Sequence, residues 1–409
     1  MASCHAGPSR GDFAVARPIK LLLVGTHPVQ YGAPLHRLYA KDPHIDLTVA
    51  YCSLQGAEAG PDPDFGVDVS WDIPLLDGYR WVHPANRSLR PRIKGFLGLI
   101  NPGLWGLIRT GEFDVVVCYG YRTVSFWIAA IAAKWYGSSL VFTTDAHSWD
   151  VREGPKWKSA LKRLLVPRIL GIADAVFAPS SAAAAHLHRM GVEERRIFLT
   201  PYVVDNAFFA EAADRSRIRL RRSWEVPDDA PLALYVAKLV PWKRPQDLLE
   251  AAARVRGLHV AMAGDGRSRP ELEARAARKD LSGRVHFLGF INQTELPDVY
   301  RAADFLVLPS EYEPFGLVVN EAFACGLTAV VSTACGCAGD LVRNGETGFV
   351  VPVGDTVALS VQLETLATDI ELRTELAKRA RSLIDKWGPR ENVAAVTAAC
   401  RRLAHEGNI

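Results

Sequence analysis

Short apolar runs alternate with helical patterns along most of this sequence, and this rhythm restricts its fold more than any other feature. Near-continuous apolar strands that alternate with helices are typical of a parallel sheet covered by helices on both faces. The rhythm breaks between Tyr202 and Asp229 and starts again at Pro231. The pattern therefore predicts an α/β fold with two Rossmann-like halves. Strands are predicted at residues 19–25, 47–51, 113–118, 139–144, 174–179 and 195–200, and then at 231–237, 257–263, 284–288, 304–308 and 328–332.

The chain has 409 residues, which at about 150 residues per domain predicts two domains. We divide it into an N-terminal extension, 1–17, an N-terminal Rossmann-like domain, 18–200, a linker, 201–230, a C-terminal Rossmann-like domain, 231–387, and a last segment, 388–409. The last segment carries an amphipathic helical pattern with no strand after it, so we expect it to pack back on the N-terminal domain. Ligands of open parallel sheets bind at the carboxyl ends of the strands. Functional residues are therefore expected in loops that directly follow strands.

Composition argues against several classes of partner and location. The net charge of +3 is too small to indicate nucleic acid as the main partner. The longest apolar stretch, Val124–Ala133, is shorter than the roughly 20 residues that a membrane-spanning helix needs. The first 17 residues do not form a signal-peptide pattern, and the seven cysteines are scattered, so we expect a cytoplasmic protein. The close pair Cys335 and Cys337 is interpreted as a turn of small residues rather than a metal site.

The strongest motif, residues 309–322, directly follows a predicted strand. Pro314 suits the first turn of a helix, where its missing N–H costs nothing. The next amides, of Phe315, Gly316 and Leu317, would then be unpaired donors at the positive end of that helix. Such a group of donors is suited to a phosphate.

Two carboxylates belong to the same motif. Glu313 precedes the predicted helix and Glu321 lies about two turns into it, so both can face one cleft. A carboxylate accepts two hydroxyl hydrogen bonds, which a ribose or a hexose offers. On spacing alone, a charge-capped surface helix with a solvated Glu321 remains an equal alternative.

In this context, Glu313 and Glu321 resemble the signature of the retaining GT-B glycosyltransferases, the large nucleotide-sugar group called glycosyltransferase family four. The match continues through Cys325 and Gly326 and through residues 336–352. The resemblance spans residues 19–404 and is more specific in the C-terminal half. It implies two Rossmann-like domains with parallel sheets facing a central cleft. It further implies retaining transfer of a hexose-type sugar from a nucleoside-diphosphate sugar to a hydroxyl acceptor, with one carboxylate on the ribose and the other on the sugar hydroxyls.

Two cations follow the first predicted strand of the C-terminal half. Lys238 and Lys243 flank a loop that leads into a helical pattern, and together they could clamp a diphosphate. The family usually has Arg and Lys here, whereas this chain has Lys238, preceded by Ala237 where Gly is common. Lysine supplies a point charge rather than a bidentate fork, so phosphate binding is retained with a different geometry. We expect both lysines to stabilise the leaving group electrostatically.

Two further loops are placed beside the donor by the resemblance. Gly264 and Gly266 follow the strand 257–263, but a plain turn is nearly as good an interpretation, because a dinucleotide fingerprint would need a third glycine. Phe290 lies where the family holds the nucleotide base and is a candidate for packing on it, whereas Phe287 is better interpreted as a core residue.

Acceptor-side candidates come from the N-terminal half. Gly32, Gln30 and His27 lie in the loop after the first strand, where the family has a glycine-containing loop near the transferred sugar. Many relatives place a histidine at the end of the strand 139–144, where this chain has Asp145, and His147 follows two residues later. We favour His147 for that role, with Asp145 as the alternative.

Two other segments have competing interpretations. Asp62-Pro63-Asp64 is formally a metal–nucleotide motif, but it lies in a Gly/Pro-rich loop, and we expect no obligatory metal or other cofactor. Residues 87–109 mix cations with apolar side chains. They suit peripheral contact with the inner face of a membrane or with a lipid-linked acceptor. The competing interpretation is a basic loop followed by a core helix.

The sequence therefore predicts a glycosyltransferase that uses a nucleotide sugar and a sugar, lipid-linked or small-molecule acceptor, as in polysaccharide or glycoconjugate biosynthesis. Two alternatives stay open. One is an epimerase-like GT-B enzyme that acts on a nucleotide sugar without an acceptor. The other is a catalytically inactive nucleotide-sugar-binding protein, which the displaced His147 leaves open.

Overall fold

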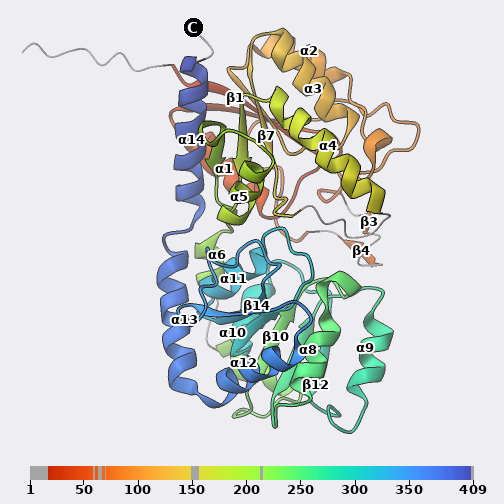
Figure 1. Cartoon of the computed structure of the whole chain (residues 1–409), viewed down its shortest axis with the longest axis vertical. Helices are drawn as coiled ribbons and strands as arrows, with labels where there is room; N and C mark the ends of the chain where they lie inside the picture. The colour runs from red at the N-terminus through yellow and green to blue at the C-terminus, as the bar shows by residue number, and fades with distance from the viewer. Residues whose placement is uncertain are drawn as a thin grey trace, which may run out of the picture.

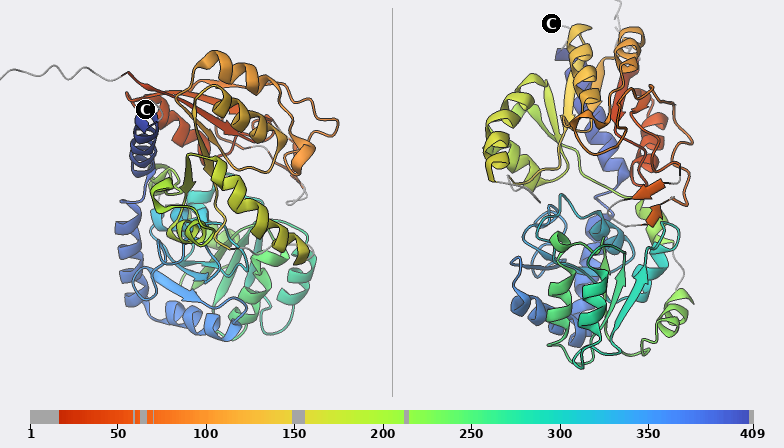
Figure 2. Two further views of the ribbon diagram at one scale, coloured as in Figure 1. Left: turned by 45° about the horizontal axis from the view of Figure 1, so that its top comes forward. Right: turned by 90° about the vertical axis from the view of Figure 1, so that its right-hand side faces the viewer.

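The computed structural model describes residues 17–58, 60–62, 67–69, 71–148, 156–211 and 215–406. Each half of the chain contains one parallel sheet, and the two halves lie one above the other (Figures 1 and 2). The N-terminal sheet has the strand order β5-β2-β1-β6-β7-β8-β9, and the C-terminal sheet has the order β12-β11-β10-β13-β14-β15. The predicted α/β class with two Rossmann-like halves is confirmed.

The elements follow the predicted alternation of strand and helix. The N-terminal half contains β1 (Ile19–Gly25), α1 (Gly32–Lys41), β2 (Ile45–Tyr51), β3 (Gly60–Asp62), β4 (Val67–Val69), β5 (Trp81–Val82), a 3-10 turn (Phe96–Gly98), α2 (Gly103–Gly111), β6 (Val115–Cys118), α3 (Val124–Trp135), β7 (Ser139–Thr143), α4 (Lys156–Ile172), β8 (Ala175–Ala178), α5 (Ser181–Arg189), a 3-10 turn (Glu194–Arg196) and β9 (Ile197–Leu199).

The C-terminal half continues in the same way and ends with three helices. It contains α6 (Asn206–Ala210), α7 (Arg215–Ser223), β10 (Leu232–Val236), a 3-10 turn (Pro241–Lys243), α8 (Pro245–Ala252), β11 (His259–Ala263), α9 (Arg269–Ala276), β12 (Val285–Gly289), α10 (Leu296–Ala302), β13 (Phe305–Leu308), α11 (Leu317–Ala324), β14 (Thr328–Ser332), β15 (Gly348–Val351), α12 (Thr356–Thr368), α13 (Ile370–Ile384) and α14 (Pro389–Glu406). The strands β3, β4, β5 and β15 are absent from the sequence-based prediction.

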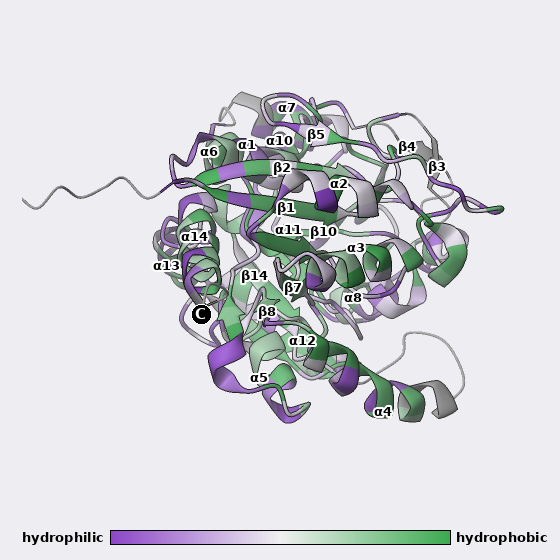
Figure 3. Cartoon of the chain, turned by 90° about the horizontal axis from the view of Figure 1, so that it is seen from above, coloured by the Kyte–Doolittle hydropathy of each residue, from purple (hydrophilic) through white to green (hydrophobic). Residues whose placement is uncertain are grey.

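Both faces of each sheet are buried, which explains the near-continuous apolar runs. In β1, Leu22 and Val24 pack with side chains of α2, α3 and α5, whereas Leu21 and Leu23 pack with side chains of α1 and α14. Figure 3 shows the central strands coloured hydrophobic along most of their length. Burying one such side chain fully contributes about 1.5–3 kcal/mol to folding stability, so each of these buried positions stabilises the sheet.

The last helix returns to the N-terminal half. Figure 1 shows α13 and α14 running along one side of the molecule, α13 beside the C-terminal sheet and α14 beside the N-terminal one. Thr397 Oγ1 donates to Asp42 Oδ2 at 2.8 Å, and Ser139 Oγ donates to the Leu403 carbonyl at 3.2 Å. The segment after the C-terminal sheet therefore closes one face of the N-terminal sheet.

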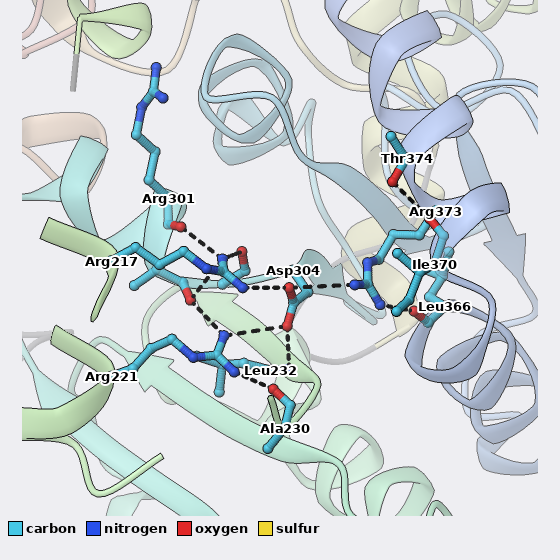
Figure 4. A network of polar contacts seen from close by, with 12 residues as sticks. Arg217, Arg221, Ala230, Leu232, Arg301, Asp304, Leu366, Ile370, Arg373 and Thr374 are labelled. Carbon is cyan, nitrogen blue, oxygen red and sulfur yellow. Dashed lines mark hydrogen bonds and ion pairs between the residues drawn. The ribbon is translucent and has the colours of Figure 1, made fainter. Parts of the chain in front are cut away.

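The segment between the two sheets contains the helices α6 and α7. Two arginines of α7 bind the carboxylate of Asp304, the residue before β13 in the C-terminal sheet (Figure 4). Arg217 donates to Asp304 at 2.8 Å, and the fully buried Arg221 forms a second ion pair with it at 3.5 Å. Burial lowers the pKa of Arg221, and the charge of Asp304 opposes that shift. Charged residues of the segment that we interpret as a linker, 201–230, therefore pack within the C-terminal half.

Candidate functional site

A cavity of about 450 Å³ lies between the two halves at the carboxyl ends of both sheets. This is the place where ligands of parallel sheets bind. The C-terminal half supplies most of its wall, and the N-terminal half supplies a smaller part. The wall includes the predicted residues Gln30, Asp145, Lys238, Lys243, Gly264, Phe290, Glu313, Phe315, Gly316, Leu317 and Glu321.

The loop after β13 is held by close backbone contacts with the turn after β14. The Gly336 amide donates to the Glu313 carbonyl, and the Cys337 amide donates to the Phe315 carbonyl, each at 2.9 Å. A Cβ on Gly336 would lie 1.9 Å from the Pro314 carbonyl oxygen, so only glycine allows this approach. These contacts fix the backbone on which Glu313 is carried.

The helix begins later than the sequence suggests. Pro314 does not lie in its first turn, because α11 starts at Leu317 and Gly316 precedes it in the left-handed region with φ 103°. Phe315 is almost fully buried and anchors the loop, which delays the helix. The Leu317 amide still belongs to the first turn, where helix geometry leaves the N–H groups without an intrahelical acceptor. The cavity wall at this point thus presents the positive end of a helix.

Glu313 and Lys243 form an ion pair inside the cavity. The carboxylate accepts from Lys243 Nζ, and the two side chains are only 12% and 17% exposed. Lys243 is the last residue of the 3-10 turn after β10, and Lys238 lies on the same loop and also lines the cavity. The structure therefore brings both predicted cations to the side of the cavity that holds Glu313.

Glu321 is buried on α11, with 8% of its surface exposed. Tyr300 on α10 donates a hydrogen bond of 2.6 Å to Glu321 Oε2. Burial raises the pKa of Glu321 to about 7, and the hydrogen bond from Tyr300 acts in the opposite direction. The solvated surface glutamate that spacing alone allows is thus not what the structure contains.

The two predicted glycines serve close backbone packing. A Cβ on Gly264 would lie 2.0 Å from the Ala237 carbonyl oxygen, and one on Gly266 would lie 2.6 Å from that of Leu239. Gly264 lines the cavity, whereas Gly266 is not among the residues of its wall. Both glycines allow the loop after β11 to support the backbone next to Lys238.

At the far end of the cavity, an aromatic pair spans the two halves. The rings of Trp71 and Phe290 lie 6.1 Å apart and are tilted by 58°. Beside them lies Gln293, which is 7% exposed and whose side-chain Oε1 has no hydrogen-bond partner in the described part of the chain. An aromatic surface of this kind is suited to packing against a flat ring.

The structure separates the two candidates after β7. Asp145 lines the cavity. His147 instead stacks on Tyr312 at 5.3 Å, and its Nε2 donates to the Glu313 carbonyl at 2.9 Å. His147 therefore contacts the backbone of the loop that carries Glu313, and this contact links the two halves.

The candidates after β1 divide between two neighbouring cavities. Gln30 lines the first cavity, whereas His27 and Gly32 line a second one of about 220 Å³. Tyr31, Tyr202 and Leu317 belong to the walls of both, so the two cavities adjoin.

The chain matches two families over most of its length. Residues 47–202 match the family described as glycosyl transferase 4-like domain, and residues 216–383 match the family described as glycosyl transferases group 1. The D-inositol 3-phosphate glycosyltransferase of Salinispora arenicola is 31% identical, over 93% of this chain and 92% of that protein. The chain belongs to the group 1 glycosyltransferases.

Other relatives of this glycosyltransferase match over a shorter part. The lipopolysaccharide core biosynthesis glycosyltransferase LpsE of Rhizobium meliloti is 34% identical, and the matched part spans 48% of its length. Among solved structures, HepE of Anabaena in complex with UDP and glucose has a TM-score of 0.71 at 20% identity, covering 93% of this chain and 99% of that one. Sucrose-phosphate synthase of Thermosynechococcus elongatus has a TM-score of 0.72 at 22% identity, covering 94% and 99%. These similarities confirm the GT-B fold.

Several cavity residues of this glycosyltransferase are missing from the sequence-based prediction. Trp71, Tyr202 and Gln293 line the cavity, and Tyr300 supports Glu321. A tyrosine on the otherwise apolar face of the 296–302 helix was a usable signal for a buried hydroxyl contact. The other three lie in irregular segments, where no periodic pattern indicates which way a side chain points.

No group of three or more His, Cys, Asp or Glu side chains within the described ranges could hold a metal ion. Asp62 ends β3, whereas Pro63 and Asp64 lie outside the described residues. Cys335 and Cys337 are buried free thiols. No helix in the described part of the chain is long and apolar enough to cross a bilayer.

Proposed function

We propose that this group 1 glycosyltransferase is a retaining enzyme that moves a hexose-type sugar from a nucleoside-diphosphate sugar to a hydroxyl acceptor. The observation that carries the proposal is the Glu313–Lys243 ion pair, which shares one interdomain cavity with Lys238 and the buried Glu321. Two cations, a helix end and two carboxylates are what a diphosphate between two polyhydroxylated rings requires.

In this arrangement the donor binds mainly to the C-terminal half. The ribose hydroxyls donate to Glu321, and the base lies at the aromatic end of the cavity beside Phe290 and Gln293. The diphosphate lies between the lysines and the amide of Leu317. Glu313 then accepts from hydroxyls of the transferred sugar, while its ion pair with Lys243 keeps that cation close to the leaving phosphate.

The transfer step exchanges one bond at the anomeric carbon for another. The acceptor oxygen forms a bond to that carbon as the bond to the diphosphate oxygen breaks, and the nucleoside diphosphate leaves with the electron pair. The acceptor proton passes to the departing phosphate, so the products are the glycoside and the protonated diphosphate. Lys238, Lys243 and the helix end stabilise the charge that develops on the leaving group.

Retention is supported by the family resemblance of the Glu313 and Glu321 motif. An inverting enzyme would need a base on the opposite face of the sugar, and Asp145 is the one carboxylate that the described N-terminal half contributes to the cavity wall. The test is proton NMR of the product formed from an α-linked donor. A small anomeric coupling, typical of an α-product, supports retention. A large coupling together with an inactive Asp145→Asn variant would assign inversion with Asp145 as base.

An assay of nucleoside-diphosphate release, with and without an acceptor, distinguishes the two alternative functions. A transferase releases nucleoside diphosphate much faster when an acceptor is added. An epimerase-like enzyme changes or releases the sugar at the same rate with or without an acceptor. A binding protein without activity binds the donor and releases nothing, and in that case the proposal of transfer is wrong.

We also propose peripheral membrane contact through the loop before α2. Leu89, Phe96 and Leu97 are 100%, 54% and 63% exposed, and Arg90, Arg92 and Lys94 lie between them in the sequence. Exposed apolar side chains among cations suit an anionic bilayer surface. Leu99, Leu104 and Ile108, by contrast, are fully buried, so the contact is confined to residues 87–98. Co-sedimentation with vesicles containing anionic lipid tests this, and unchanged binding of a Leu89→Ser, Phe96→Ser variant would contradict it.

A further inference from the structure

The carbonyl oxygen of Glu313 accepts two hydrogen bonds, one from each half of the molecule. Within the C-terminal half, the Gly336 amide donates to it at 2.9 Å. From the N-terminal half, Nε2 of His147 donates to it, also at 2.9 Å. Because the next residue is Pro314, this peptide group has no N–H, and its carbonyl is the one polar group by which it can be held. Two lone pairs meet two donors, so the peptide is fully bonded only while the halves are in contact.

His147 itself lies outside both cavities. It belongs to neither wall, whereas Asp145, two residues before it, lines the first cavity. Since a carbonyl oxygen only accepts, the proton is on Nε2, and the backbone of the protein occupies this nitrogen. The imidazole also stacks on Tyr312, with the ring centroids 5.3 Å apart and the planes inclined by 22°. His147 is thus held against the loop that carries Glu313 and not against the space for substrate.

A second contact between the halves holds the other partner of the Glu313 carbonyl. Asp340 Oδ2 accepts from the amide of Ser181, the first residue of α5, at 2.8 Å. A carboxylate at the positive end of a helix is favourable. Asp340 lies four residues after Gly336, in the turn that donates to Glu313. The N-terminal half therefore contacts both the loop and the turn that fix this peptide.

The orientation of the Glu313 carboxylate depends on its backbone. The side chain is 12% exposed and pairs with Lys243 inside the first cavity. In the proposed transfer it also accepts from hydroxyls of the transferred sugar, so a rotation of its peptide would displace the carboxylate from both partners. A displacement of about 1 Å near the reacting atoms can lower a rate about 100-fold. The backbone contacts of Glu313 should therefore affect turnover.

We propose that His147 is a positioning residue that orients Glu313 through its backbone and makes this orientation depend on contact between the two halves. The inference rests on the proposed glycosyl transfer, in which Glu313 binds the transferred sugar. It gives His147 a role that requires no contact with either substrate. When the halves separate, the Glu313 carbonyl keeps its bond from Gly336 and loses the one from His147.

The first experiment separates the hydrogen bond of His147 from its ring stacking. His147→Gln keeps an N–H donor and removes the ring, whereas His147→Phe keeps a ring on Tyr312 and removes the donor. The phenylalanine variant should lower kcat about fivefold, as expected for one lost hydrogen bond, and the glutamine variant should restore most of it. Affinity for the nucleoside diphosphate, which lacks the sugar, should stay within about twofold of wild type in both. A kcat unchanged in His147→Phe, or lowered equally in both variants, would overturn the proposal.

The control is Asp72→Ala, which removes another contact between the halves. The Asp72 carboxylate accepts from the Thr294 amide at 3.2 Å, at the end of the cavity that holds Trp71 and Phe290. This variant should keep kcat within about twofold, because the contact is exposed and does not involve the peptide of Glu313. A loss equal to that of His147→Phe would show that any contact between the halves has the same effect, and the specific role of His147 would be wrong.

The second experiment asks whether His147 acts through Glu313. Calorimetry gives the dissociation constants of a nucleotide sugar and of its nucleoside diphosphate, and their ratio reports the contacts of the sugar. His147→Phe should weaken binding of the nucleotide sugar relative to the diphosphate about threefold in wild type. In a Glu313→Ala background, with no carboxylate to orient, the same substitution should change the ratio by less than about 1.5-fold. Equal changes in both backgrounds would contradict the proposal.

These readouts separate the inference from the proposed function. If a nucleotide sugar binds but is not turned over, the transferase assignment fails, and the affinity ratio still tests His147. If transfer proceeds and His147→Phe leaves kcat and the ratio unchanged, the role of His147 fails and the transferase assignment stands.

Discussion

The two halves of this glycosyltransferase meet at the same structural edge, the carboxyl ends of a parallel sheet, yet they present opposite chemistry there. The C-terminal half contributes Lys238, Lys243, Glu313 and Glu321 to the first cavity. Among the described residues of the N-terminal half, Asp145 is the one Asp, Glu, Lys or Arg in the wall of the first cavity, and the wall of the second cavity has none. One fold, used twice, thus presents charged side chains at one cavity and uncharged side chains at the other.

The comparison also shows where electrostatics should control function. Charges on largely buried side chains, such as those of Glu313 and Lys243, interact more strongly than charges in water. Substitutions on the C-terminal side should therefore change turnover and donor affinity by large factors. Substitutions of N-terminal residues in the cavity walls should mainly change acceptor affinity, by the smaller factors of single neutral contacts.

The largest effect is expected from Glu313→Gln. This change removes the charge that pairs with Lys243 and weakens the hydrogen bonds from the sugar, so turnover should fall about 100-fold. Steady-state kinetics with a saturating donor measures it. The control is Glu311→Gln, two residues away and 60% exposed in its side chain, which should keep turnover within about twofold. Equal losses in both variants would indicate a general disturbance of the loop.

A smaller effect is expected from pH, through Glu321. Burial raises its pKa to about 7, and only its ionised form accepts hydrogen bonds from both ribose hydroxyls. Donor affinity should therefore level off above about pH 8, and at pH 6 it should be about one tenth of its value at pH 8. Calorimetry with a nucleotide sugar measures this, because both of its phosphates are esterified and stay ionised across the range.

Two variants sharpen the assignment of that pH dependence. Tyr300→Phe removes the hydrogen bond that lowers the pKa of Glu321, so the midpoint of the affinity profile should move to higher pH. Glu321→Gln should bind the donor weakly and without the profile. A midpoint unaffected by Tyr300→Phe would show that another group titrates.

The smallest effect is expected from Lys238→Arg, which restores the residue that the family usually has. A guanidinium offers a bidentate fork to phosphate, so the dissociation constant for the nucleoside diphosphate should fall about threefold. Lys238→Met, which removes the charge, should raise it. If both variants bind the diphosphate like wild type, Lys238 does not contact it.

The fold was predictable because both faces of each sheet are buried, so every strand of the core appeared as an apolar run. The edge strand β5 has only two residues, too few for an apolar run to stand out, whereas three of the four residues of β15 are apolar and were a usable signal. The arginine-rich sequence of α7 gives no clear apolar pattern, and Asp304, the partner of Arg217 and Arg221, lies more than 80 residues away in the chain.

The two sides of the site also differed in how far they could be predicted from the sequence. Glu313, Glu321 and the lysines stand in local motifs, and the structure brings them to one cavity. The second cavity is assembled from one or two residues of each of five strands, four residues of α1 and two of α14. Sequence spacing contains no trace of such an assembly. The choice between Asp145 and His147 likewise depended on which side chain turns toward the cavity, which a two-residue shift in a loop does not reveal.

The most direct test of the charged donor side is a titration of wild type and Glu321→Ala with UDP, GDP, ADP and dTDP and their common sugar conjugates, followed by thermal unfolding. Glu364→Ala on α12, outside the cavity wall, is the control. A nucleotide at 100 times its dissociation constant stabilises the fold by about 2.7 kcal/mol. We predict that one base gives a clear rise in melting temperature in wild type and Glu364→Ala, and that the rise disappears in Glu321→Ala. No rise with any nucleotide at millimolar concentration, or an undiminished rise in Glu321→Ala, would contradict the assignment of the donor site.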